Sequence, residues 1–479
     1  MSKTFYITTP IYYPNAKLHM GHAYTTVICD VLARAHRLKG EEVYFLTGAD
    51  ENTEKVVRAA KEAGQNMEEY LNNIVENFKS LFSKLEISYD QFIRTSDSKN
   101  HWPGVTEIWK LLEKSGDIEK RSYEGLYCVG HEAFITEKDL VLGKCPEHDE
   151  KPQLLKEENY FFKLSKYTKQ IKEKIESGEM EIIPESRKNE ILALLERGLE
   201  NISFSRSADK MSVGIPVPND SSQKIYVWGD ALVNYISALG FGRGDELYKK
   251  FWPGMHVIGK DILRFHAAIW PGMLLSAGLP LPKKLLVHGF ITSGGKKMSK
   301  SLGNVIDPMF LIDTYGAEAV RYYLARHISP FEDGDLTLES FKDAYNANLA
   351  NGLGNLTSRI MKMAQDNIEK LKEEKIEELE KKEIPKEFFD YLDKFEINKA
   401  VDLIWFEISE MDKFIQENQP FKVVKTEKEK GQKMISDLVI RLFNVAKMLE
   451  PILPETSVKI KELIKQNRTP DKPLFARKD

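Results

Sequence analysis

Two short segments of the sequence carry residue types suited to handling phosphate. The motif HMGH at residues 19–22 sets two imidazoles beside a glycine, directly before a helical pattern at 23–39. Backbone N–H groups and the dipole at the start of a helix favour phosphate at such a position. The motif KMSKS at 297–301 sets two ammonium groups in a glycine-rich loop, which can close on a triphosphate and neutralise the charge of departing pyrophosphate. Together the two motifs indicate activation of a substrate by ATP.

The composition is that of a globular protein with several domains. The 479 residues are 42% hydrophobic and 30% charged, and at about 100–200 residues per domain this length predicts two to four domains. No apolar run approaches the roughly 20 residues that a membrane span requires. Because the N-terminus reads as a strand rather than as a signal or transit segment, we expect a cytoplasmic protein with no membrane partner.

Charge and cysteine usage narrow the class further. The formal net charge is −4, so a nucleic-acid partner would have to be met by a local basic surface rather than by the field of the whole chain. The three cysteines are too few for a disulfide framework and fit a reducing compartment.

The motifs need a framework, and strand-like and helical patterns alternate around them. Such alternation predicts a parallel sheet built from βαβ units. It is interrupted by an irregular insertion at 121–222, which contains a cluster of cysteines and histidines. The strand-like segments are 5–8, 42–47, 225–228, 256–259 and 285–288, and the helical ones are 23–39, 54–63, 67–85, 231–239 and 262–277.

After about residue 331 the pattern changes to long helices, at 340–365, 388–417 and 430–450. This predicts an all-α bundle. The Lys- and Glu-rich segment 368–386 is interpreted as a solvated helix face or loop. The expected domains are 1–120 and 223–292 for the two halves of the sheet, 121–222 for the insertion, 293–339 for the KMSKS loop and a stem-contact region, and 340–479 for the bundle.

Several longer segments, in their order along the chain, resemble the methionyl-tRNA synthetases, a family of class I aminoacyl-tRNA synthetases. They are TTPIYYPN at 8–15 leading into HMGH, YVWGDA at 226–231, GKD at 259–261, KMSKS, and PILPET at 451–456. The resemblance implies an α/β fold: a Rossmann-type class I synthetase catalytic domain with a parallel sheet, split by a connective insertion with a zinc-knuckle-like element and followed by an all-α anticodon-binding bundle.

The family's chemistry would be attack of the methionine carboxylate on the α-phosphorus of ATP, giving methionyl-adenylate, and transfer of the methionyl group to tRNA(Met), including initiator tRNA. The resemblance implies ATP with Mg²⁺, L-methionine and tRNA(Met) as partners. Many relatives dimerise through an appended C-terminal domain that is not in this sequence, so we expect a monomer. The enzyme would act by alignment and charge stabilisation, without a protein nucleophile.

Site residues follow from the matched positions. Methionine is flexible and polarisable, so aromatic and aliphatic walls suit its thioether, and Asp50 is the natural partner for its ammonium group. The implied methionine-binding residues are Pro10, Ile11, Tyr13, Asp50, Trp228, Ala231, Leu232, Tyr235 and His266. The implied ATP-binding residues are His19, Gly21, His22, Gly259, Lys260, Asp261, Lys297, Ser299 and Lys300, of which His19, His22, Lys297 and Lys300 are catalytic.

The insertion contains two C-x₂-H pairs in turn-forming sequence, Cys128 with His131 and Cys145 with His148. Two thiolates and two imidazoles can close a tetrahedral zinc site, which would be structural because it leaves no position open for substrate. The pairs resemble the zinc knuckle of the family, where cysteine is common at the position of His131. A metal-free knuckle held by packing stays open as the alternative.

The expected anticodon-binding residues are Asn355, Arg359, Pro420 and Phe421. Asn355 and Arg359 are four residues apart on one helical face. Phe421 stands where relatives usually have Trp, which keeps a stacking face but reduces its area. Two further departures are Asn52, where relatives usually have His, and Gly229, where a bulkier residue is common. We expect Gly229 to leave the rim of the pocket roomier or more mobile.

Other functional classes stay open from the sequence alone. Another class I synthetase shares both motifs, although the leucyl, isoleucyl and valyl enzymes need a large editing insertion. A cysteinyl enzyme needs an active-site zinc, and Cys29 has no ligand cluster beside it in the sequence. A non-catalytic tRNA-binding module is the alternative from a different class, and the intact motifs argue against it.

Overall fold

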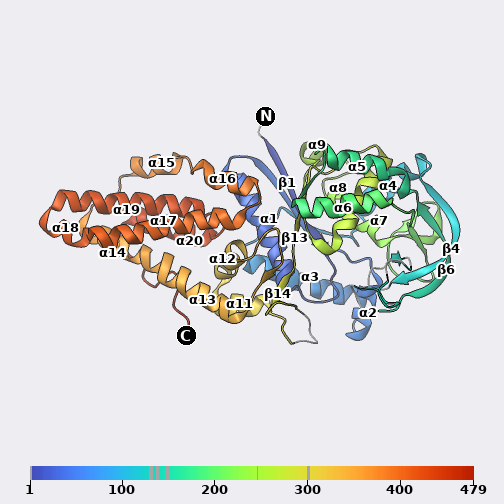
Figure 1. Cartoon of the computed structure of the whole chain (residues 1–479), viewed down its shortest axis with the longest axis horizontal. Coiled ribbons are helices and arrows are strands. Elements are labelled where there is room, and N and C mark those ends of the chain that lie inside the picture. The colour runs from blue at the N-terminus through green and yellow to red at the C-terminus, as the bar shows by residue number, and fades with distance from the viewer. Residues whose placement is uncertain are drawn as a thin grey trace.

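A six-stranded parallel sheet forms the centre of the molecule (Figure 1). The computed structural model describes residues 3–128, 133–135, 137, 140–146, 150–244, 246–298 and 303–479. The sheet order is β3-β2-β1-β12-β13-β7. Its strands are β1 Thr4–Tyr12, β2 Glu42–Ala49, β3 Gln91–Arg94, β7 Glu181–Ile183, β12 Met255–Gly259 and β13 Lys284–His288.

The chain leaves β1 in one direction toward β2 and β3, and it returns on the other side of β1 as β12 and β13. In open parallel sheets, ligands bind outside the carboxyl ends of the strands at the point where the strand order reverses. The carboxyl ends of β1 and β12 mark that point here.

Helices cover both faces of the sheet (Figure 1), and their apolar stripes account for the burial. Thirteen of the 19 residues of the helix after β1 are buried, because the helix packs on the sheet on one side and on the C-terminal helices on the other. The helices of this part are α1 Met20–Leu38, α2 Glu54–Glu62, α3 Met67–Lys84, α4 Trp102–Lys114, α5 Thr168–Glu176, α6 Glu185–Arg197, α9 Glu246–Phe251 and α10 Trp270–Ala277.

The sequence prediction is confirmed for most of these elements and wrong for three. Of the expected strand at 225–228 only Ile225 is in a strand, and a short helix at Val227–Ala231 follows, in which Gly229 and Asp230 are buried. The expected helix at 231–239 is two short helices. The expected helix at 262–277 begins with a π-helical segment before it becomes regular.

The insertion contributes a four-stranded and a three-stranded antiparallel sheet, and also one strand of the central sheet. Residues 181–183 of the expected insertion pair with β13. The other elements are β4 Ile118–Cys128, β5 Ala133–Ile135, β6 Gln153–Phe162, η2 Leu164–Tyr167, β8 Ile202–Ser203, β9 Ser205–Ser207, β10 Pro216–Val217 and β11 Asp220–Ile225.

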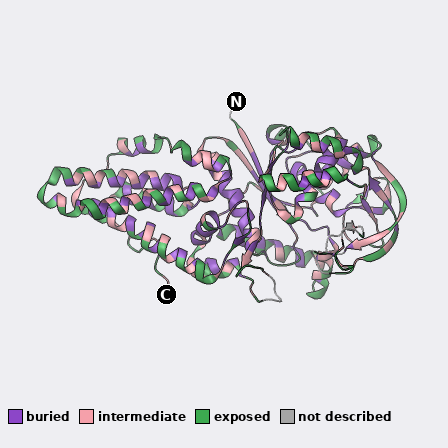
Figure 2. Cartoon of the chain, in the orientation of Figure 1, coloured by how far each residue is buried: buried purple, intermediate pink, exposed green. Residues whose placement is uncertain are grey.

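The C-terminal region is helical, as expected, and Figure 2 shows its buried residues on the faces between helices. The Lys- and Glu-rich segment forms a helix that buries Ile376 and Leu379. No helix of the described residues is long and apolar enough to cross a membrane. The helices are α11 Pro308–Tyr315, α12 Ala317–His327, α13 Leu338–Ala344, η6 Tyr345–Gly354, α14 Asn355–Asn367, α15 Glu373–Lys381, α16 Lys386–Asp393, α17 Ile397–Asn418, α18 Pro420–Thr426, α19 Lys428–Leu449 and α20 Pro454–Gln466.

A buried ion pair joins the central sheet to the bundle. Arg321 of α12 and Asp30 of α1 are fully buried, and their Nη1 and Oδ2 atoms are 2.7 Å apart. The guanidinium also donates to the carbonyl oxygens of Leu85, Pro451 and Ile452 at 2.8 to 3.0 Å. Asp30 accepts from the backbone N–H and the hydroxyl of Ser88. Every charged atom therefore has a partner, which a buried pair requires.

We expect Arg321→Met to lower the free energy of unfolding by about 3–5 kcal/mol, because it leaves the Asp30 carboxylate buried without its main partner. Urea unfolding followed by tryptophan fluorescence measures the loss. The control is Arg468→Met, which removes a surface pair with Asp471 and should cost less than about 1 kcal/mol. Equal losses in the two variants would contradict the assignment.

Candidate functional site

The start of α1 offers two imidazole N–H groups near the carboxyl end of β1. Nδ1 of His19 accepts from the N–H of Gly21, and Nδ1 of His22 accepts from the N–H of His19, both at 3.1 Å. An imidazole nitrogen that accepts carries no hydrogen, so in a neutral ring the proton lies on Nε2. Both rings thus offer an Nε2–H donor beside the positive end of a helix, where a phosphate is favoured.

Desolvation favours the neutral form of both imidazoles. Desolvation, together with the neighbouring His19 and His288, holds the pKa of His22 well below its ordinary value. Desolvation also lowers the pKa of His19, opposed by Asp261 and assisted by Lys297. Since Asp261 and Lys297 both act on His19, the segment after β12 and the KMSKS loop face the HMGH motif.

Gly21 is required by the cap. A Cβ atom at this position would lie 2.9 Å from Cε1 of His19. Any side chain would therefore push the His19 ring off the backbone N–H that fixes its orientation.

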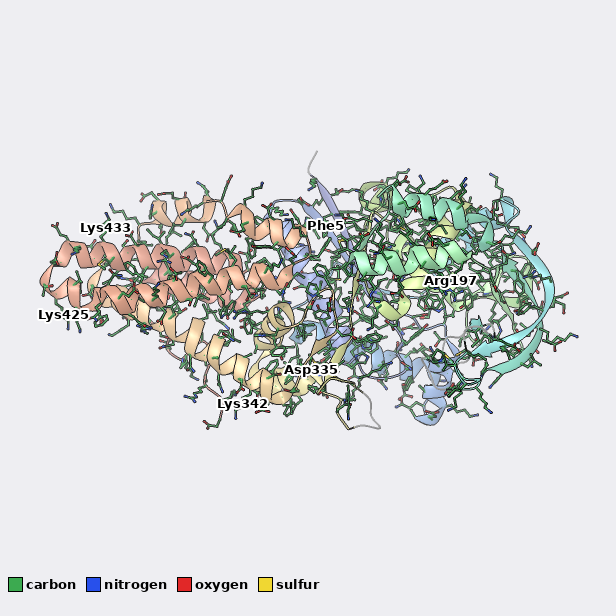
Figure 3. All side chains as sticks on the ribbon, in the orientation of Figure 1. Phe5, Arg197, Asp335, Lys342, Lys425 and Lys433 are labelled. Carbon is green, nitrogen blue, oxygen red and sulfur yellow. The ribbon has the colours of Figure 1, made fainter. Side chains whose placement is uncertain are left out.

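The first part of the KMSKS loop is a short hairpin of β14 Ile291–Ser293 and β15 Lys296–Lys297. Two glycines with φ of +62° and +71° make its turn. Asp335, at the junction of sheet and bundle in Figure 3, lies in β16 Gly334–Asp335 and accepts from the N–H of Gly295 at 2.9 Å. Lys297 is exposed. Ser299 and Lys300 lie outside the described residues.

Two predicted ATP-binding lysines flank one aromatic ring. Nζ of Lys260 lies 4.4 Å and Nζ of Lys297 lies 5.4 Å from the ring centroid of Phe290. Lys260 also forms an ion pair with both carboxylate oxygens of Asp333, at 2.7 and 2.8 Å. The sequence reasoning missed Phe290 and Asp333, because only the tertiary fold brings them to these lysines.

The predicted methionine-binding residues lie at the carboxyl ends of β1 and β2 and in the helices beside them. Pro10 and Ile11 lie at the end of β1 and Tyr13 directly follows it. Asp50 directly follows β2, where Tyr12 and Ala49 are paired. Asp50 is 2% exposed. The remaining residues are Trp228 and Ala231 in α7 Val227–Ala231, Leu232, Tyr235 in α8 Asn234–Ser237, and His266 in η4 Phe265–Ile269, close to the GKD turn in η3 Lys260–Ile262.

Tyr235 and His266 form a neutral hydrogen-bonded pair. Nδ1 of His266 lies 2.9 Å from the carbonyl oxygen of Ile262, which can only accept, so Nδ1 carries the hydrogen. Nε2 then accepts from the hydroxyl of Tyr235 at 2.7 Å. Burial lowers the pKa of His266 to about 4. An uncharged, polarisable surface of this kind suits a thioether.

Trp228 is held by stacking on Phe265, with ring centroids 3.8 Å apart and planes 10° apart. The next residue is Gly229, which we expected to leave the rim roomier. The expectation of a roomier rim is wrong, because a Cβ at Gly229 would lie only 2.7 Å from Cζ of the buried Phe204. The Phe204 ring occupies the space that a larger residue at 229 would take.

A buried polar network fixes α7 against the segment after β2. Asp230 is fully buried and accepts from Nδ2 of Asn52 at 2.7 Å. Its other oxygen lies 2.6 Å from Nε2 of His101. The Asn52 amide also donates to the carbonyl of Thr95, whose hydroxyl lies 3.4 Å from Asp50. The Asn52 side chain thus donates two hydrogen bonds. The network joins α7, which contains Trp228, to the Asp50 carboxylate.

Only half of the predicted zinc site can be located. Cys128 ends β4 and Cys145 lies near the other end of the knuckle, and each is 1% exposed. His131 and His148 lie outside the described residues. Among the residues that are described, no group of three possible ligands gathers.

Two of the four predicted anticodon residues line a cavity of about 600 Å³ in the bundle. Arg359 and Phe421 line it, and Arg359 forms an ion pair with Asp412. Asn355 begins α14 one turn before Arg359, and Pro420 begins α18. The other lining residues are Ser358, Lys362, Met363, Ile415, Thr469 and Pro470.

The sequence of this chain is similar to the sequences of known proteins. The family model of the class I tRNA synthetases (M) matches residues 5–153 and 147–361. Methionine–tRNA ligase of Caldanaerobacter subterraneus subsp. tengcongensis is 43% identical over 96% of this chain and 74% of its own length. The same enzyme of Clostridium perfringens is 46% identical over 96% and 73%.

A solved structure is similar as well. Mycobacterium tuberculosis methionyl-tRNA synthetase in complex with methionyl-adenylate has a TM-score of 0.88 at 34% identity, covering 96% of this chain and 94% of that one. The apo form of the same enzyme has a TM-score of 0.83 at 30% identity, covering 100% and 99%.

Proposed function

Because this chain belongs to the class I tRNA synthetase family of methionine–tRNA ligases, we propose that its crevice activates L-methionine with ATP and transfers the methionyl group to tRNA(Met). Initiator tRNA is included among the substrates. Apart from the family membership, the proposal rests on one observation about the residues of this chain. The two Nε2–H donors begin the helix that follows β1, and the ring centroid of His22 lies 4.8 Å from that of Tyr12, whose carbonyl oxygen accepts from the N–H of Asp50 at 3.0 Å.

In the first reaction, the methionine carboxylate attacks the α-phosphorus of ATP and pyrophosphate leaves. His19 and His22 donate their Nε2–H groups to phosphate oxygens without carrying charge. Lys297 and Lys300 stabilise the negative charge that builds on the leaving group. Gly21, Ser299 and the segment Gly259 to Asp261 complete the nucleotide site. Mg²⁺ accompanies ATP and offsets phosphate charge.

The amino acid is selected by complementary chemistry. Asp50 binds the ammonium group, and the Tyr235–His266 pair meets the thioether beside the wall that Trp228 provides. Pro10, Ile11, Tyr13, Ala231 and Leu232 close the remaining sides. A neutral His266 matters, because an imidazolium next to an apolar side chain would be desolvated at high cost.

We expect exchange of pyrophosphate into ATP to depend on methionine alone when all twenty amino acids are tried. His22→Gln can put an amide N–H near the position of Nε2, whereas the shorter Asn cannot reach it. His22→Asn should therefore lower the exchange rate by about a hundredfold, and His22→Gln by much less. Exchange with another amino acid, or equal losses in both variants, would contradict this assignment.

We also propose that Cys128, His131, Cys145 and His148 hold a structural Zn²⁺. The donor set suits zinc, and both cysteines are buried although Leu142 between them is 97% exposed. Freshly purified protein should contain about one zinc per chain, and Cys145→Ala should contain almost none. Metal analysis decides, and a stoichiometry near zero in the unmodified protein would refute the site.

Asn355, Arg359, Pro420 and Phe421 are proposed to bind the anticodon, within a bundle domain at 340–479. The sheet halves at 1–120 and 223–292, the insertion at 121–222 and the loop region at 293–339 make up the rest, with residues 181–183 paired in the central sheet. The cavity combines a cation, an aromatic face and apolar walls, which suits an unstacked base.

We expect Arg359→Gln and Phe421→Ala each to lower kcat/KM for tRNA(Met) by about tenfold or more, with methionine-dependent exchange unchanged, because a stacked or hydrogen-bonded base contributes about 1–3 kcal/mol. Phe421→Trp enlarges the stacking face and should raise tRNA affinity. Lys433→Ala is the control, since this exposed lysine lies elsewhere on the bundle (Figure 3). Normal charging by both variants would exclude this cavity.

A further inference from the structure

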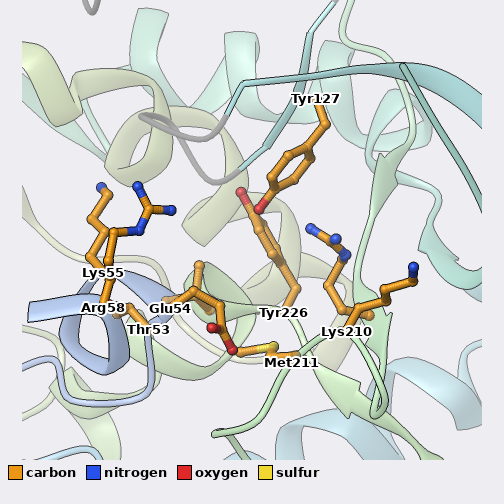
Figure 4. A pocket seen from close by; sticks show the side chains of 10 residues that line it. Thr53, Glu54, Lys55, Arg58, Tyr127, Lys210, Met211 and Tyr226 are labelled. Carbon is orange, nitrogen blue, oxygen red and sulfur yellow. The ribbon is translucent and has the colours of Figure 1, made fainter. Parts of the chain in front are cut away.

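Tyr235 lies in a closely packed part of the methionine pocket. The chain just before Trp228 borders a cavity of about 180 Å³, and Figure 4 shows Tyr226 among the side chains that line it. Neither Tyr235 nor any aromatic residue whose ring contacts it lines that cavity. Because Tyr235 is only 1% exposed, its position is set by the side chains around it.

One face of the Tyr235 ring lies against His256, a residue of β12 outside the set of predicted methionine-binding residues. The ring centroids are 4.0 Å apart and the planes are 31° apart, and His256 is fully buried. Tyr6 of β1 donates through its hydroxyl to the carbonyl oxygen of Tyr235 at 2.7 Å. The neighbouring strands β1 and β12 therefore hold both the ring and the backbone of Tyr235.

A hydrogen bond fixes the plane of the His256 imidazole. Its Nδ1 atom lies 2.8 Å from Oγ1 of Thr8, which is also fully buried. Thr8 and His256 are partners in the parallel register of β1 and β12, so the bond joins neighbouring side chains on one face of the sheet. An imidazole anchored in this way cannot turn its flat face away from Tyr235.

The other nitrogen of His256 has no partner. Its Nε2 atom is buried and makes no hydrogen bond within the described part of the chain, which costs free energy in a protein interior. Desolvation, and then the neighbouring His266, hold the pKa of His256 well below its ordinary value.

Stability alone therefore does not explain a histidine at position 256. An asparagine would offer Thr8 a similar anchor but no flat face to Tyr235. A phenylalanine would offer the flat face but no anchor. Histidine supplies both, and the unpartnered Nε2 atom accompanies that combination.

We propose that His256 is a positioning residue that holds Tyr235 at the methionine thioether and so sets the preference for methionine over other side chains of the same length. The inference rests on the proposed function, in which the Tyr235–His266 pair meets the thioether. Tyr235 keeps its 2.7 Å hydrogen bond to His266 while its ring rests on His256. Norleucine probes this arrangement, because it has a methylene group in place of the polarisable sulfur.

The test compares His256→Asn, which keeps the anchor, and His256→Phe, which keeps the flat face, with the control His36→Phe. His36 stacks on Phe5 with ring centroids 3.5 Å apart, in the last turn of α1. In pyrophosphate exchange, both His256 variants should raise the KM for methionine about tenfold, with kcat and the KM for ATP within about twofold of the wild type. Their preference for methionine over norleucine in kcat/KM should fall about tenfold. The control should change neither quantity.

Thr8→Val removes the anchoring hydroxyl and should shift the same two quantities in the same direction. Combined with His256→Phe, it should add nothing, because the anchor is already lost. Unchanged methionine KM and norleucine preference in the His256 variants would overturn the proposal, as would a parallel loss of kcat and of ATP affinity. If neither His256 variant folds, Thr8→Val decides by the same two quantities. Absence of exchange in the wild-type protein would instead refute the proposed function.

Discussion

The buried ion pair between Asp30 and Arg321 determines how the two halves of the molecule sit together. Asp30 belongs to the helix whose first turn carries the two histidines, and Arg321 reaches the turn between the last two helices of the bundle. Neither charge could stay in this apolar interior alone. The helix that presents His19 and His22 is therefore anchored to the C-terminal helices as well as to its own sheet.

The segment that follows Arg321 extends this connection into the site. The hydroxyl of Tyr24 in α1 donates to the carbonyl of Ser329 at 2.8 Å. Asp333 pairs with Lys260 after β12, and Asp335 holds the turn of the KMSKS hairpin. Residues 329–335 thus contact the three elements that surround the phosphate site, directly after a helix that packs on the bundle. A shift of the bundle would be transmitted to all three contacts.

Local patterns in the sequence were enough to predict the strands and helices around the HMGH motif, because each buries a continuous apolar run or stripe. They failed where tertiary packing decides. β7 has only three residues, and its place in the sheet depends on pairing with a strand about a hundred residues later. Helix α12 reads as an ordinary amphipathic helix, and nothing local reveals that Arg321 is buried. The same limit hid His101 and Thr95, whose partners come from other elements.

Two residues near the methionine pocket, Gly229 and Asn52, differ from those usual in the family, and the effect of each depends on a neighbouring residue. Gly229 suggested a gap, yet Phe204 from the insertion fills the volume that a side chain there would need. Asn52 cannot titrate as a histidine would, but its amide satisfies both Asp230 and the carbonyl of Thr95. In each case a neighbour distant in sequence restores packing or hydrogen bonding. The pocket therefore depends on such pairs rather than on any one residue type, and a change at either position requires a matching change at its partner.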